Sequence, residues 1–92
     1  MNLITQGLDL LEKNISFVAV KIYSSNEKRI AVGTKILVTE QKSFGECPLV
    51  KNELITEARG VLKNGNTITK ILNFSNIQLK VCFEVVGLQK II

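Results

Sequence analysis

The sequence predicts an α+β domain of two layers, in which two helices cover one face of a four-stranded antiparallel sheet. Two segments carry apolar residues at the three- and four-residue spacing of an amphipathic helix, and four segments carry the alternation of a strand. These segments follow one another as helix, strand, strand, helix, strand, strand. The length of 92 residues suits one domain, so we expect residues 1–92 to fold as a single unit.

The αββ order occurs twice, and this predicts an internal repeat of about residues 1–41 and 52–92. Short matches accompany the repeated order, since Leu3-Ile4-Thr5 resembles Leu54-Ile55-Thr56 and Ser25-Asn26 resembles Ser75-Asn76. A small β-barrel with an N-terminal helix is the main alternative fold, because a short sheet can also close on itself.

The first helix is predicted near the start of the chain. Four apolar residues recur at helical spacing and share one face: Ile4, Leu8, Leu11 and Ile15. Asn2 can cap the first turn, and Lys13 and Asn14 suit the last one. We expect the shared apolar face to pack on the sheet.

The next two strands are expected to form a hairpin. Residues 16–24 alternate, with Val18, Val20 and Ile22 on one side and Phe17, Ala19, Lys21 and Tyr23 on the other. A polar turn follows at residues 25–28, and a second strand runs from Arg29 to about Glu40. Residues 41–50 contain Gly45 and Pro48 and are predicted to be a loop.

The second helix is predicted over Asn52–Lys63. Five apolar residues fall within an arc of about 120° on a helix: Leu54, Ile55, Ala58, Val61 and Leu62. In a strand, the same residues would mix apolar and polar side chains on both faces. Asn52 is a candidate for the cap, and Gly65 can end the helix.

Two further strands complete the predicted sheet. Residues 67–74 form one strand, Ser75-Asn76 turns the chain, and Ile77–Val86 alternates most regularly. Leu79, Val81 and Phe83 face inward in this interpretation, and Lys80 and Cys82 face outward. Leu88, Ile91 and Ile92 form an apolar tail that should also find a packing partner.

The composition argues against most catalytic and metal chemistry. The sequence contains no histidine, so Ser–His and Cys–His nucleophilic arrangements are excluded. Its two cysteines, Cys47 and Cys82, cannot supply the four ligands of a zinc site, and whether they pair with each other stays open. No glycine-rich phosphate loop is present. We therefore expect a non-enzymatic protein that has no catalytic residues, no metal site and no cofactor.

The predicted fold leaves one sheet face open, and this face suggests the function. We expect it to carry nine residues: Phe17, Ala19, Lys21, Tyr23, Lys35, Leu37, Ile71, Lys80 and Cys82. This set is more apolar than a freely hydrated face requires. The hypothesis is a protein-binding or assembly module, such as a homo-oligomer, a subunit of a phage particle or a small inhibitor. Its partner would be another protein or a second copy, bound through Phe17, Tyr23, Leu37 and Ile71 or at a sheet edge.

The alternative hypothesis is binding of single-stranded nucleic acid by the same face. Lys21, Lys35 and Lys80 would neutralise phosphates and Tyr23 would stack on a base. The net charge of +4 permits an anionic partner, although the basic residues are spread evenly along the chain. No apolar segment reaches the roughly 20 residues of a membrane span, so we expect no membrane contact and a cytoplasmic location, or a virion.

Overall fold

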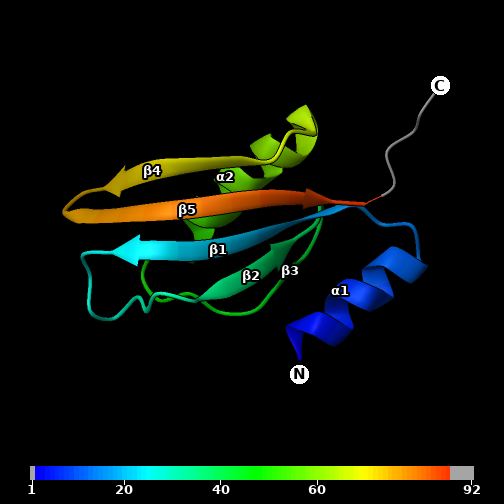
Figure 1. Cartoon of the computed structure of the whole chain (residues 1–92), viewed down its shortest axis with the longest axis horizontal. Helices are drawn as coiled ribbons and strands as arrows, with labels where there is room; N and C mark the ends of the chain where they lie inside the picture. The colour runs from blue at the N-terminus through cyan, green and yellow to red at the C-terminus, as the bar shows by residue number, and fades with distance from the viewer. Residues whose placement is uncertain (1, 88–92) are drawn as a thin grey trace.

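The computed structural model describes residues 2–87, and the predicted apolar tail at Leu88, Ile91 and Ile92 lies outside them. The elements follow in the order α1 (Leu3–Glu12), β1 (Phe17–Ser25), β2 (Lys35–Val38), β3 (Ser43–Phe44), α2 (Lys51–Asn64), β4 (Ile68–Phe74) and β5 (Ile77–Val86). The strands form one antiparallel sheet in the order β3-β2-β1-β5-β4 (Figure 1). The α+β class is confirmed, and the sheet is open at both edges instead of closing into a barrel.

The predicted number of four strands is wrong, because the described sheet has five. The additional strand is β3, which lies in the segment predicted as a loop and pairs Phe44 with Leu37 and Ser43 with Val38. The turn before it is closed by Thr39, whose backbone N–H donates to the Lys42 carbonyl at 2.9 Å. A two-residue strand is too short to produce a recognisable alternation in the sequence.

The predicted strand from Arg29 to Glu40 is also corrected, since β2 covers Lys35–Val38 alone. Two successive turns replace its first half: Ile30 N–H donates to Glu27 O at 3.0 Å, and Thr34 N–H donates to Ala31 O at 3.1 Å. Ile30 is buried in the core, whereas Val32 is 63% exposed. The apolar residues of this segment therefore belong to turns that the buried Ile30 side chain attaches to the core, and they do not form an extended strand.

The second helix and the last hairpin agree with the prediction. Helix α2 ends at Gly65, whose φ of 78° gives the left-handed cap expected there. Its N-cap is Val50, which makes no side-chain capping hydrogen bond, so the predicted cap at Asn52 is wrong by two residues. Leu54, Ala58 and Val61 are buried against the sheet, and β4 and β5 join through Ser75-Asn76.

The predicted layering is corrected, because the two helices lie on opposite faces of the sheet. Helix α2 packs on the face formed by Val18, Val20 and Ile22 of β1 and by Leu79, Val81 and Phe83 of β5. On the other face, Leu10 of α1 packs with Phe17, Ala19 and Leu37. The physical reason is that β1 and β2 are apolar on both faces, so each face needs its own cover.

The two predicted αββ units occupy unequal positions in this fold. The first strand of the first unit, β1, is central, whereas the first strand of the second unit, β4, lies at the sheet edge. Their helices are on opposite faces. Within residues 2–87, neither helix is long and apolar enough to cross a membrane.

Candidate binding surface on the α1 side of the sheet

The strand register places the nine residues expected on the open sheet face on one side. Lys21 is the Cα partner of both Lys35 and Cys82, and Ile71 is the partner of Lys80. Tyr23 follows Lys21 by two residues, so strand parity puts it on this side as well, and a β-bulge between Ile22 and Ser24 makes Ser24 the partner of Lys80. The prediction of a shared face therefore agrees with the structure.

Helix α1 covers half of that face, and this divides the predicted binding residues. Phe17 and Leu37 are only 4% exposed, since they form a small core with Leu10 of the helix. They lie beneath α1 instead of on an accessible surface. Tyr23 and Ile71, in contrast, are 53% and 60% exposed. Half of the predicted protein-binding set is thus accessible, and the other half holds the helix in place.

The uncovered half of the face carries the predicted basic residues. Lys21, Lys35 and Lys80 occupy three different strands and lie on the same side as Tyr23. The Lys21 ammonium is 3.8 Å from the Glu84 carboxylate, an ion pair that offsets part of the positive charge. We call this half, with Lys21, Tyr23, Lys35, Ile71, Lys80 and Cys82, the open sheet surface.

The outward face of α1 is an apolar surface that the sequence interpretation assigned to the core. Three large apolar side chains stand on it, with exposures of 68%, 59% and 38%: Ile4, Leu8 and Leu11. Ile15, which the sequence placed on the same helix face, lies beyond the end of α1 at Glu12 and is 40% exposed. The helix packs on the sheet through a different row, Leu3, Gly7 and Leu10, with the Gly7 position facing the Phe17 ring. We call Ile4, Leu8 and Leu11 the α1 stripe.

The signal for this inversion is present in the sequence. Leu3, Gly7 and Leu10 repeat at the same helical spacing as the α1 stripe, shifted by one residue. In the structure the row of Leu3, Gly7 and Leu10 packs on the sheet and the other row stays exposed. A Cβ at Gly7 would lie 3.5 Å from the Phe17 ring, which is ordinary van der Waals contact.

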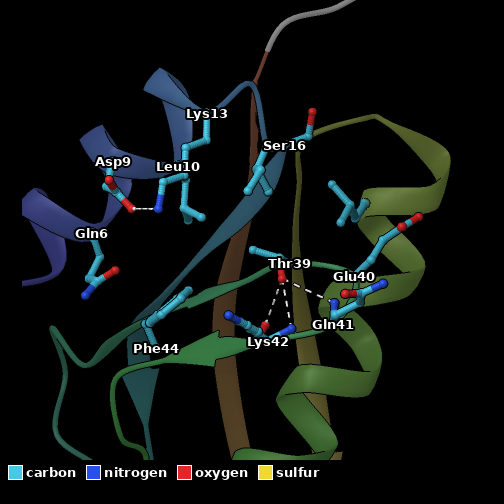
Figure 2. Close-up of a pocket in the computed structure, with 12 residues that line it drawn as sticks. Gln6, Asp9, Leu10, Lys13, Ser16, Thr39, Glu40, Gln41, Lys42 and Phe44 are labelled. Carbon is cyan, nitrogen blue, oxygen red and sulfur yellow. Dashed lines mark hydrogen bonds and ion pairs between the residues drawn. The ribbon is translucent and has the colours of Figure 1, made fainter.

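A groove of about 790 Å³ separates α1 from the turn between β2 and β3 (Figure 2). Gln6, Asp9 and Lys13 of α1 stand on one side, and Glu40 and Gln41 of the turn stand on the other. Apolar side chains also contribute to the lining: Leu10, Ile15, Phe44 and Leu62. Asp9 and Lys13 form an ion pair at 3.0 Å, so their charges largely satisfy each other.

Thr39 fixes the turn that forms one wall of this groove. Its buried hydroxyl accepts the N–H groups of Gln41 at 3.2 Å and Lys42 at 2.9 Å (Figure 2). Arg59 Nε of α2 donates to the Thr39 carbonyl at 3.1 Å and ties the turn to the opposite layer. The wall is therefore rigid, and its polar groups are engaged in holding the turn.

The titratable groups of residues 2–87 form no cluster of three or more metal-ligating side chains. Glu57, one of the carboxylates of α2, pairs with Lys70 at 2.5 Å. Cys47 is buried and burial raises the pKa of its thiol, whereas Cys82 is half-buried on the open sheet surface, and both thiols are free. The Arg29 guanidinium lowers the pKa of the partly buried Glu27 carboxyl by a hydrogen bond within the turn.

The fold and these surfaces define a small α+β domain with a half-covered sheet. No family model and no curated protein matches the sequence. The structure is similar to part of the crystal structure of a xanthine dehydrogenase from Bacillus halodurans, with a TM-score of 0.74 and 18% sequence identity. The match covers 96% of this chain and 31% of that chain. At this identity the similarity shows the fold alone, and this chain spans about a third of the other chain's length.

Proposed function

We propose that this chain is a non-enzymatic protein-binding or assembly module whose contact surface is the α1 stripe together with the neighbouring open sheet surface. The observation that supports the proposal is the row of three exposed apolar side chains at the spacing of one helix face. Leaving this area in water costs free energy, roughly 25 cal/mol for each Å² that a partner could cover. A continuous apolar row on a small domain is typical of an interaction site.

The form of the α1 stripe suggests how a partner would bind. Ile4, Leu8 and Leu11 follow one another at spacings of four and three residues, the pattern of helices that insert into an apolar groove of another protein. Thr5, Asp9 and Glu12 flank the row and would form a polar rim. The absence of histidine from the sequence argues against the commonest catalytic arrangements.

Site-specific photocrosslinking in the source cells tests the proposal. A photoreactive amino acid at Leu8 should form adducts with a defined protein, and the same residue at Val32 should not, although Val32 is equally exposed at 63%. An Ile4→Lys substitution should reduce the Leu8 adduct about tenfold or more, because a charge would have to be desolvated in the contact. Equal adducts from both positions, or none from Leu8, would contradict the proposal.

The second candidate function is binding of single-stranded nucleic acid, which the proximity of Lys21, Lys35, Lys80 and Tyr23 on one surface favours. Titration with a fluorescent oligonucleotide is the test. With about three phosphate contacts, affinity should fall roughly twentyfold between 50 and 200 mM salt. Lys21→Glu should weaken binding strongly, whereas Lys63→Glu, an equal charge change on α2, should not. Binding that responds equally to both variants would contradict this function.

A further inference from the structure

The outer edge of β4 is a surface whose backbone geometry suits pairing with another strand. Among the described strands, β4 pairs with β5 alone and forms one edge of the sheet. Its seven residues include no proline and one charge, Lys70, whose ammonium is already paired with Glu57 of α2. Edge strands that avoid pairing are usually short, bulged or marked by free charges or proline. The β4 edge has none of these features, because it is seven residues long, has a regular register and carries one lysine whose charge is paired.

The hydrogen bonds of Gln78 reveal which backbone groups of β4 point outward. Gln78 N–H donates to Asn26 Oδ1 at 2.8 Å, and its carbonyl accepts the Asn26 N–H at 3.2 Å, so these groups point away from β4. Because neighbouring strand residues point their backbone groups to opposite sides, the next residues of β5 point theirs toward β4. They meet the even-numbered residues of β4 in the observed register.

The odd-numbered residues of β4 therefore direct their backbone groups outward. These residues are Thr69, Ile71 and Asn73, and all three are exposed. Their N–H and C=O groups form a row that matches the requirements of another antiparallel strand. The middle one, Ile71, is also the central residue of β4.

We propose that this edge pairs with the β4 edge of a second copy of the chain, antiparallel across a two-fold axis at Ile71. In this register Ile71 lies opposite Ile71 of the second copy, and Thr69 lies opposite Asn73 of the second copy. Each of these residue pairs can form backbone hydrogen bonds between the two strands. Lys70 faces Leu72, so no lysine opposes a lysine. A shift by one residue would mismatch the backbone groups, and a shift by two would leave residues unpaired.

The self-complementarity of the strand selects a second copy over an unrelated partner. In a two-fold contact the same surface of both copies must be complementary to itself. In this register each outward N–H group meets a C=O group, corresponding faces of the two sheets lie on the same side, and like charges do not oppose each other. The contact is smaller than the roughly 1,200–2,000 Å² of stable interfaces, so a concentration-dependent dimer is expected. This inference goes beyond the proposed function, because it concerns backbone pairing at the edge of β4, although the side chain of Ile71 also belongs to the open sheet surface.

Sedimentation equilibrium with the full chain, from about 10 µM to about 1 mM, tests the inference. The apparent mass should rise with concentration from 10.2 kDa toward twice that value. Ile71→Lys and Ile71→Glu should each remain monomeric, since like charges would meet on the axis, and an equal mixture of the two should dimerise again. Val32→Lys should behave as the unaltered chain, because Val32 matches Ile71 in exposure, at 63% and 60%, and lies outside β4.

A second measurement uses the unaltered chain, so its result does not depend on whether the variants fold. Hydrogen exchange at the amides of Thr69, Ile71 and Asn73 should slow severalfold as concentration rises, with no change at Val32. A monomer at every concentration would overturn the inference, as would a dimer that Ile71→Lys leaves intact. A dimer lost in Leu8→Lys instead would overturn pairing at β4 while leaving the proposed function of the α1 stripe in place.

Discussion

At the scale of single residues, two glycines have opposite roles. Gly45 has a φ of 100°, and a Cβ there would lie 2.9 Å from the Lys35 carbonyl oxygen. Gly60 lies within α2, and a Cβ there would meet no atom within 4 Å. The first glycine is required by the close approach of the β3 segment to β2, and the second serves no visible packing purpose.

We therefore predict opposite effects of alanine at these two sites. Gly45→Ala should lower the free energy of unfolding by about 2–3 kcal/mol, since it combines a strained backbone conformation with a steric clash. Gly60→Ala should raise it by about 0.5–1 kcal/mol by reducing the conformational entropy of the unfolded chain. Urea denaturation measures both, and a Gly45→Ala protein as stable as the unaltered chain would contradict the structure.

At the scale of elements, α1 differs from the other helix in how it is anchored. Leu10 is the one buried residue of α1, whereas Leu54, Ala58 and Val61 anchor α2. Asn2 caps α1 by accepting the Ile4 N–H at 2.8 Å, which supports the helix itself but not its attachment to the sheet. A helix held by one buried side chain is expected to detach before the sheet unfolds.

The prediction is that α1 opens as a separate unit. Amides of Leu8–Glu12 should exchange hydrogen at least tenfold faster than those of Val20 and Val81, which lie in the centre of the sheet. Leu10→Ala should widen this difference, because it removes the side chain that contacts Phe17 and Leu37. Equal protection of α1 and the central strands, measured by mass spectrometry or NMR, would show that the helix is part of the main cooperative unit.

At the scale of the whole molecule, the α1 stripe and the β4 edge lie in different places. The α1 stripe projects from one side of the sheet, and the β4 edge lies at the far end of the strand order from β2 and β3 (Figure 1). One chain could therefore use both surfaces at once, joining a second copy at β4 while α1 contacts another protein. This arrangement is consistent with an assembly module and explains why separate variants test the two proposals.

Much of the architecture was predictable from local sequence. The alternation of Ile77–Val86 and the helical arc of Asn52–Lys63 identified β5 and α2, since each repeats over enough residues to exceed chance. The pairing of Tyr23, Lys21, Lys35, Lys80 and Ile71 on one face also followed from strand parity. The turns at residues 27–34 were not predictable, because alternating apolar residues also occur where a single side chain, Ile30, anchors a loop.

The sequence by itself determined the α+β class, the element types and the sides of the strands, because helix and strand periodicity are local properties of the backbone. The tertiary structure alone decided that α1 and α2 lie on opposite faces, that Phe17 and Leu37 are covered, and that the α1 stripe is exposed. These outcomes depend on which apolar row fits closest against the sheet. The row of Leu3, Gly7 and Leu10 and the row of Ile4, Leu8 and Leu11 have the same helical periodicity, so periodicity alone does not decide which of them faces the sheet.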